Sequence, residues 1–291
     1  MGDQNIYAIP KIIMDIKTCK FYHTMDLPGH GVVEGKWDLR DNVDQYLGSV
    51  IFEGKRVLEL GTASGYLCFE MEKRGAEVVA YDIGENEKWD VVPYAQYDYQ
   101  EFRRSFREYT DGFKNAFWYC HRVLKSKAKV VYGSIYKIPE EIGTVDIATF
   151  GSILLHLRDP FLAMQSALRL VKDTVIVTDL ARERGFSVFG RQTMVQRLWG
   201  LIQRHVLGGG MVEDRRGPSI EFLPDFRNLT HKAAWWYLSP GIIVNFLGIL
   251  GFEESQITYH YQEPRYKGET RQLLYTVVGK RTREQSEVGD L

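Results

Sequence analysis

The chain has 291 residues, of which 44% are hydrophobic and 26% charged, a composition typical of a globular protein with a sizeable core. Its 37 Lys and Arg residues balance 38 Asp and Glu residues, so no bulk charge attracts it to nucleic acid or to an anionic membrane. Cys19, Cys68 and Cys120 are too few and too scattered for a disulfide framework or a thiolate metal cluster. We therefore expect a soluble, cytoplasmic protein with neither a membrane nor a nucleic-acid partner.

The first 48 residues gather aromatic and histidine side chains around a Pro-Gly turn, in the stretch FYHTMDLPGHGVVEGKWD. The stretch that follows, DLRDNVDQYLG at 38–48, is amphipathic and predicts a helix. His23 and His30 match no metal-ligand spacing, so we expect no metal. We interpret the segment as a lid over a site, with Tyr22, His23 and Trp37 facing a ligand.

From residue 55 onward, β-rich runs alternate with helical runs, which predicts a parallel α/β sheet. Strands are expected at 55–60, 76–83, 129–136, 144–151 and 174–180, and helices at 66–75 and 160–171. A further helix is expected from Pro240, with Ser239 as its N-cap and Gly251 as its stop. Two β-runs, 255–262 and 271–281, then follow with only a loop between them, so we expect an antiparallel pair at the edge of the sheet.

Two long segments interrupt this core. Residues 84–127 are rich in aromatics and helical in pattern, and a second amphipathic stretch lies at 193–207. Long insertions in compact domains are usually lids or binding elements. We therefore divide the chain into four parts. They are an N-terminal lid segment (residues 1–48), a core (49–182 with 239–281) that contains the insertion 84–127, a substrate-cap insertion (183–238) and a flexible tail (282–291).

The central signal is the stretch VLELGTASGYLCFEMEKRGAEVVAYD, a strand, a glycine-bearing turn, a helix and a second strand. Gly61 and Gly65 lack the Cβ that would keep the backbone away from a ligand. Asp82, at the tip of the second strand, is placed to accept both hydroxyls of a ribose. A dinucleotide site would need G-x-G-x-x-G, but Ala63 and Tyr66 occupy the second and third glycine positions. The pattern therefore favours a ligand without a pyrophosphate.

This spacing resembles the E/D-x-G-x-x-x-G loop of class I S-adenosylmethionine methyltransferases, in which an acidic residue orients the loop. The terminal pair of β-runs agrees, since that fold closes a seven-stranded sheet with an antiparallel last strand. The resemblance implies S-adenosyl-L-methionine as cofactor, bound by residues of the loop and of the strand ends: Glu59, Gly61, Thr62, Ala63, Gly65, Asp82, Ile83, Ser134, Ile135, Phe150, Gly151 and Ser152. The alternative is a doubly wound fold that binds no cofactor.

The stretches YHTMDLPG and LLHLRDP together resemble a narrower family, the methyltransferases like the bacterial tRNA wobble-uridine carboxymethyltransferase, over roughly residues 20–280. This resemblance implies an N-terminal segment folded over the methyl donor. The tRNA enzyme has a tyrosine directly before the histidine of the second stretch, which helps to recognise a carboxylated donor. Leu155 stands there in this chain, so the ordinary donor is favoured.

Oxygen and protonated amine acceptors must lose a proton, and His156 and His23 are the candidate catalytic residues because imidazole titrates near neutral pH. The alternative for His156 is a hydrogen bond to the backbone. Candidate substrate-binding residues come from the lid, the strand ends and the cap: Tyr22, Trp37, Leu155, Asp179, Trp235 and Trp236. Asp179 is equally suited to cap a loop, and the two tryptophans to close the core.

Three functions from different classes are compatible with these patterns. The favoured one is a methyltransferase acting on a hydroxyl or amine of a small aromatic or cyclic molecule, in specialised metabolism such as natural product biosynthesis. A tRNA wobble-uridine-modifying enzyme is the second, and the balanced charge counts against it because tRNA affinity depends largely on phosphate contacts. The third is a non-catalytic binding module with a relict pocket. We expect a small-molecule substrate, and the sequence is compatible with a homodimer.

Overall fold

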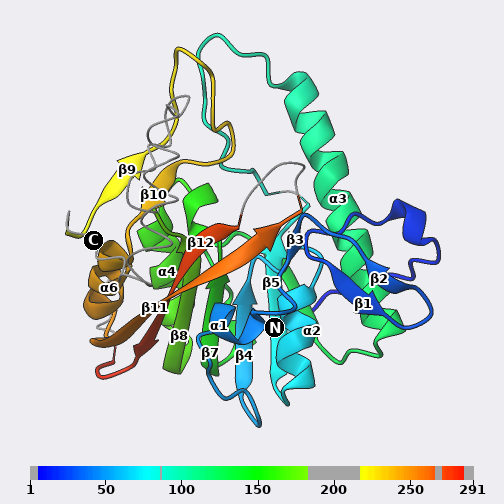
Figure 1. The fold of residues 1–291 in the computed structure, drawn as a ribbon, viewed down its shortest axis with the longest axis horizontal. Coiled ribbons are helices and arrows are strands. Elements are labelled where there is room, and N and C mark those ends of the chain that lie inside the picture. The colour runs from blue at the N-terminus through cyan, green and yellow to red at the C-terminus, as the bar shows by residue number, and fades with distance from the viewer. Residues whose placement is uncertain (1–5, 86, 183–216, 266–270, 285–291) are drawn as a thin grey trace, which may run out of the picture.

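The computed structural model describes residues 6–85, 87–182, 217–265 and 271–284 (Figure 1). Within these residues the main sheet has eight strands, in the order β3 (Trp37–Asp38), β11 (Glu254–Pro264), β12 (Gln272–Lys280), β8 (Val171–Leu180), β7 (Val145–Gly151), β4 (Arg56–Leu60), β5 (Glu77–Ile83) and β6 (Lys129–Gly133). The strands from β4 to β8 pair in parallel. β12 pairs antiparallel with both β8 and β11.

This arrangement confirms the α/β fold and the antiparallel last strand that the sequence predicted. The strand count differs by one, because β3 adds an eighth strand at the edge. β3 joins the sheet through only two residue pairs, Asp38 with Glu263 and Trp37 with Pro264. A strand of two residues has no periodicity that could reveal it in the sequence.

Alternation along the strands gives the sheet two apolar faces. The covering helices are α1 (Val43–Tyr46), α2 (Tyr66–Lys73), α3 (Gln100–Val123), α4 (Pro160–Leu168) and α6 (Pro240–Ile249). Leu58 and Leu60 of β4 belong to the core that packs against α4 and α6. Val57, on the opposite face, belongs to the core formed with α1, α2 and α3. The sheet is therefore covered by helices on both faces.

α6 begins and ends where its sequence predicted. The hydroxyl oxygen of Ser239 accepts from the N–H of Ile242 at 3.3 Å and from the N–H of Ser219 at 2.8 Å, so one side chain caps the helix and holds the incoming chain. Gly251 follows the helix in the left-handed region, with φ of 88°.

The N-terminal segment differs from the helical lid that we expected. It contains a hairpin of β1 (Met25–Leu27) and β2 (Gly31–Val33), and the helix predicted over 38–48 is confined to α1. Asp38 lies in β3 instead, where its carboxylate accepts two hydrogen bonds from Arg40, at 2.9 and 2.8 Å. Strand pairing thus overrides the helical pattern at the start of this stretch.

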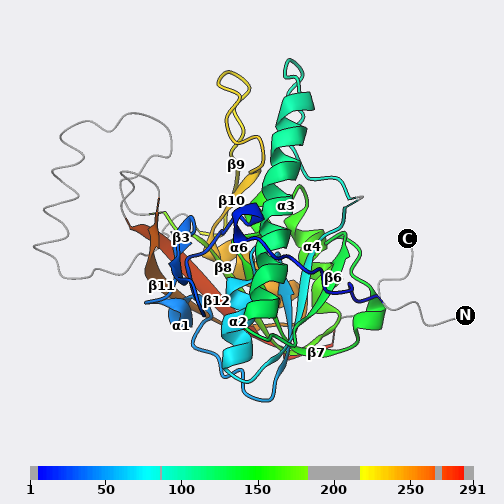
Figure 2. The same ribbon diagram turned by 90° about the vertical axis from the view of Figure 1, so that its right-hand side faces the viewer.

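The two insertions extend the molecule in one direction. In both views, the amino-terminal end of α3 and the segment between β9 (Ile220–Phe222) and β10 (Trp236–Leu238) project beyond the sheet (Figures 1 and 2). α3 confirms the helical pattern of the first insertion. The helix predicted at 193–207 and most of the predicted tail lie outside the described residues. Among the described helices, none combines the length and apolarity needed to cross a bilayer.

Two glycine substitutions test how tightly the N-terminal segment packs. A Cβ on Gly35 would lie 2.3 Å from the carbonyl carbon of His23, whereas a Cβ on Gly248 in α6 would meet nothing within 4 Å. Gly35→Ala should lower the free energy of unfolding by about 1–3 kcal/mol because backbone must move. Gly248→Ala should raise it by about 0.5–1 kcal/mol. Urea unfolding measures both, and a stabilising Gly35→Ala would show that the segment packs differently.

Candidate active site at the carboxyl edge of the sheet

The loop between β4 and α2 has a left-handed backbone at three positions. Gly61 has φ of 80°, Ala63 has φ of 49° and Gly65 has φ of 87°. A Cβ on Gly65 would also lie 2.6 Å from the ring of Phe69 and 2.7 Å from the ring of Phe117. Only glycine fits at position 65, where the loop turns into α2. The loop therefore presents backbone, with few side chains, at the carboxyl edge of the sheet.

Asp82 connects the end of β5 to this loop. Its Oδ2 accepts from the N–H of Ala63 at 2.9 Å, and its Oδ1 accepts from the N–H of Ile83 at 2.7 Å. Burial raises the pKa of Asp82, while the two N–H groups and the charge of Lys114 lower it. Each carboxylate oxygen has a second lone pair, so both can still accept from a bound hydroxyl.

Two buried polar atoms beside the loop have no hydrogen-bond partner among the described residues. They are Oε2 of Glu59 and Oγ1 of Thr62. Burial raises the pKa of Glu59 to about 7 and the nearby charge of Asp82 acts in the same direction, whereas the Thr62 side chain and the backbone N–H of Cys68 lower it. Buried polar atoms without partners are costly. A polar ligand that bonds to them would remove this cost, so the residues present fit a cofactor at this place.

The end of β6 lies beside the end of β5, because Ile83 pairs with Gly133. The hydroxyl of Tyr81 donates to the carbonyl of Ser134 at 2.9 Å, which fixes the chain where it leaves the strand. The Ser134 hydroxyl oxygen accepts from the N–H of Tyr136 at 3.4 Å, and Ile135 packs against the core. Ser134 and Ile135 therefore follow the strand that is paired with the end of β5, where Asp82 lies.

β7 ends with the buried Phe150 and with Gly151, and the loop after it begins at Ser152, which has φ of 49°. The hydroxyl oxygen of Tyr46 lies 3.3 Å from Oγ of Ser152, and a Cβ on Gly151 would lie 3.0 Å from it. The N–H of Ser152 donates to the carbonyl of Thr178 in β8 at 2.7 Å. Sequence analysis missed Tyr46, although its place on the apolar side of the amphipathic stretch 38–48 was a usable signal.

The N-terminal segment contacts the glycine loop, since the N–H of Tyr22 donates to Oγ of Ser64 at 3.1 Å. Trp37 lies beside it, and its N–H donates to the carbonyl of Tyr22 at 3.0 Å. The ring of His23 lies against those of Tyr22 and Tyr66, at centroid distances of 4.9 and 5.6 Å. Burial lowers the pKa of His23 to about 3, so its imidazole is neutral at pH 7.

His156 ends the short helix η3 (Leu154–His156) in the loop after β7. Its Nδ1 donates to the carbonyl of Ala233, and the carbonyl of Leu155 accepts from the N–H of Trp235 at 2.8 Å. Burial lowers the pKa of His156, and the bond to Ala233 acts in the opposite direction. Both residues thus fasten the segment before β10 to the loop after β7.

Asp90 joins several loops that the sequence did not link. Its carboxylate accepts from the hydroxyl of Tyr136 and from the N–H of Arg158, and its carbonyl accepts from Nε1 of Trp235 at 2.7 Å. Nε1 of Trp236 donates to the carbonyl of Arg158 at 3.1 Å. The two indole N–H groups therefore bond to the backbone. A single aspartate within a long insertion gives no sequence signal for this role.

Asp179 lies near the end of β8 and is 4% exposed. Its Oδ1 accepts from the N–H of Leu180 at 2.7 Å, and its Oδ2 has no partner that meets hydrogen-bond geometry among the described residues. Burial raises the pKa of Asp179 to about 7, while the backbone N–H groups of Leu180 and Leu155 lower it. Burial also raises the pKa of Tyr46, and Tyr22, Asp179 and Glu59 add to the effect. The charges of Asp179 and Glu59, from β8 and β4, therefore act on the Tyr46 hydroxyl, which lies 3.3 Å from Oγ of Ser152.

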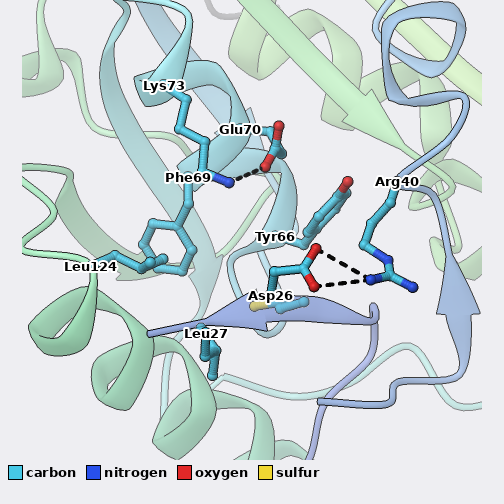
Figure 3. Close-up of a pocket in the computed structure, with 9 residues that line it drawn as sticks. Asp26, Leu27, Arg40, Tyr66, Phe69, Glu70, Lys73 and Leu124 are labelled. Carbon is cyan, nitrogen blue, oxygen red and sulfur yellow. Dashed lines mark hydrogen bonds and ion pairs between the residues drawn. The ribbon is translucent and has the colours of Figure 1, made fainter. Parts of the chain in front are cut away.

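A separate pocket lies between the β1–β2 hairpin and α2 (Figure 3). Arg40 pairs there with Asp26 at 3.0 Å, and Lys73 pairs with Glu70. These charges neutralise one another within the pocket lining, and none of the residues predicted as a site from the sequence lines it. The pocket is therefore distinct from the groups at the strand ends.

Known proteins resemble this chain in fold and in sequence family. The N-terminal domain of EvdMO1, solved in the presence of SAH and D-fucose, shares the fold with a TM-score of 0.53 at 14% identity, over 91% of this chain and 93% of that one. Magnesium protoporphyrin IX methyltransferase (ChlM) from Synechocystis PCC 6803, with bound SAH, has a TM-score of 0.47 at 14% identity. The match covers 84% of this chain and 82% of that one. No curated protein matches the sequence. The model of a methyltransferase domain matches residues 35–240, most of the chain, and the protein therefore belongs to the methyltransferase-domain family.

Proposed function

We propose that the protein is an S-adenosylmethionine-dependent methyltransferase that methylates a hydroxyl or amine of a small cyclic or aromatic molecule in specialised metabolism. The observation that carries this proposal is the bond between Asp82 and the peptide N–H of Ala63. It brings a carboxylate at one strand end and a backbone loop at the next into a single binding surface. That surface suits a ribose and a charged amino-acid moiety, with no phosphate between them.

In this proposal, the residues predicted from the sequence hold the donor. Asp82 accepts the ribose hydroxyls, while Ser134 and Ile135 contact the adenine. The backbone of the glycine loop, with Glu59 and Thr62, holds the methionine end, where each of these two side chains has an oxygen without a hydrogen-bond partner in the described part of the chain. The remaining predicted contacts are made by Ile83, by Phe150 and Gly151 at the end of β7, and by Ser152 in the loop after it. When bound, the cofactor supplies a methyl group on a sulfonium centre, and the protein's main task is to align the acceptor with it.

The two histidines are better suited to positioning than to proton transfer. The Nδ1 of His156 is committed to the carbonyl of Ala233, so only its Nε2 is free to accept a proton. Burial lowers the pKa of both His156 and His23, which makes each a weaker base than exposed imidazole. We therefore propose that His23 supports the lid against the site and that His156 anchors the segment before β10.

The proposed acceptor class draws on one neighbour and on the cap. The N-terminal domain of EvdMO1 was solved with D-fucose, a cyclic polyol, as well as with SAH. A cyclic acceptor of that size suits a site bordered by Tyr22 and Trp37 on the lid side and by Trp235 and Trp236 on the cap side. A small molecule rather than a nucleic acid is also in keeping with the balanced charge of the chain.

Asp82→Ala tests donor binding. The substitution removes acceptors for the ribose hydroxyls and the bond that fixes the glycine loop, so we expect SAH affinity, measured by calorimetry, to fall roughly ten- to hundredfold. Glu77→Ala, at the exposed opposite end of the same strand, is the matched control and should leave affinity unchanged. Unchanged affinity in Asp82→Ala would remove the basis for the cofactor assignment.

Glu59→Gln tests the buried carboxyl through stability. The pKa of Glu59 is raised from 4.5 to about 7 in the folded protein, so its contribution to stability is greatest below pH 4.5 and is lost as pH rises through 7. Gln cannot ionise. We therefore expect Glu59→Gln to gain stability relative to the wild type between pH 5 and pH 8, by about 3 kcal/mol. Thermal unfolding at several pH values measures this, with Glu77→Gln as control, and a pH-independent difference would contradict it.

A further inference from the structure

We propose that Asp179 and Tyr46 flank the position of the transferred methyl group and form the acceptor subsite, in which Asp179 takes the proton of a hydroxyl or ammonium group. The sequence predicted only that Asp179 is a candidate substrate-binding residue, and it predicted no role for Tyr46. The inference rests on the proposed methyl transfer, and it adds the residues that act on the acceptor side of that reaction.

The position of the Tyr46 hydroxyl is the first support. It lies 3.3 Å from Oγ of Ser152, in the loop after β7, and a Cβ at position 151 would lie only 3.0 Å from it. The N–H of Ser152 in turn donates to the carbonyl of Thr178, the residue before Asp179. The hydroxyl therefore lies where the loop after β7 meets the end of β8, at the carboxyl edge of the sheet.

A buried polar network holds Tyr46 in this position from behind. Oγ1 of Thr178 donates to the carbonyl of Tyr46 at 2.7 Å, and it lies 2.8 Å from Oγ1 of Thr276. Nε2 of His260 bonds to Oγ1 of Thr276 at 2.9 Å, and Nε2 of Gln262 donates to Nδ1 of the same imidazole at 3.0 Å. Four side chains from three strands thus fix α1 on the sheet. Such rigid support is what a positioned catalytic group requires.

Charge defines the class of acceptor. Asp179 and Glu59 are both buried carboxyl groups near the Tyr46 hydroxyl, and each has one oxygen without a hydrogen-bond partner among the described residues. A hydroxyl or an ammonium group of the acceptor donates to Oδ2 of Asp179, whereas the oxygen of Glu59 faces the methionine end of the methyl donor in the proposed function. An acceptor carboxylate or phosphate would be repelled by both carboxyl groups. The subsite therefore selects neutral or cationic acceptors that donate hydrogen bonds.

The reaction balances with the groups named. The lone pair of the acceptor oxygen or nitrogen forms the new bond to the methyl carbon, and the bond from that carbon to sulfur breaks, with its electron pair remaining on sulfur. An ammonium acceptor first gives a proton to Oδ2 of Asp179, which frees its lone pair, whereas a hydroxyl gives its proton to Oδ2 as the new bond forms; in both cases the proton passes from Asp179 to solvent. The Tyr46 hydroxyl bonds to the acceptor atom and keeps its lone pair in line with the methyl group.

Sinefungin makes a test that needs no known acceptor. This analogue of the donor carries an ammonium group where the methyl projects, so it places a cation in the proposed subsite, whereas SAH does not. At pH 8 we expect the wild type to bind sinefungin roughly ten- to hundredfold more tightly than SAH by calorimetry. Asp179→Asn should abolish this preference and leave SAH affinity unchanged. Asp173→Asn, at the opposite end of β8, is the matched control.

Two further measurements distinguish the contribution of Tyr46 from those of the neighbouring carboxyl groups. Tyr46→Phe should reduce the preference several-fold, whereas Tyr119→Phe, another buried tyrosine, should not. The preference should also fall between pH 8 and pH 6, as Asp179 takes up its proton. Tyr46 from α1 and Tyr275 from β12 face Asp179, and Glu59 titrates in the same range. Because Glu59 and Asp179 titrate in the same pH range, Glu59→Gln is the control for this measurement. If Asp179 is the group responsible, the preference for sinefungin must still depend on pH in that variant.

The outcomes distinguish the two proposals. If the wild type binds SAH but shows no preference for sinefungin, or if Asp179→Asn keeps the preference, the subsite is wrong and the methyltransferase proposal stands. If the wild type binds neither compound, the proposed function itself is overturned, and the subsite falls with it.

Discussion

The hydrogen bond from the N–H of Ala63 to the carboxylate of Asp82 is the contact on which the rest of the site depends. It holds a loop with left-handed backbone against the end of the neighbouring strand, so α2 starts at a fixed place. The N-terminal segment then docks on the same loop through Tyr22 and Ser64. Two hydrogen bonds near the carboxyl edge of the sheet therefore hold the N-terminal segment, the glycine loop and the sheet in fixed positions relative to one another.

The face of the sheet below α1 and α2 is apolar near the start of its strands and polar near their ends. Glu59 and Thr149 are paired on β4 and β7, and Thr178 and Thr276 are paired on β8 and β12. Polar groups buried this densely lower stability unless each is bonded, and Oγ1 of Thr149 is, like Oε2 of Glu59, without a partner among the described residues. A protein optimised only for folding would have apolar residues here, so the polar ends of these strands reflect selection for binding.

Elements with a strong local signal were predictable from the sequence. The core strands follow from their apolar runs, and α6 follows from Ser239 and Gly251, because caps act over only a few residues. The loop and the acidic strand ends were predictable because parallel strands bring their carboxyl ends to one edge. Tyr46 and Asp90 were not, since their roles depend on partners over 60 residues away in the chain. Nor was β3, because its pairing requires β11.

The bonds around Asp90 also bear on how the site exchanges its ligands. One side chain joins the segments after β5, β6 and β7, and its own carbonyl ties in the cap through Trp235. Hydrogen bonds that hold these segments together reduce the entropy that ligand binding would otherwise lose in ordering them. Because one side chain bonds to all of these segments, they would have to move away from the site together. If release of the product is slow, the opening that limits it would therefore require the hydrogen bonds of this one carboxylate to break.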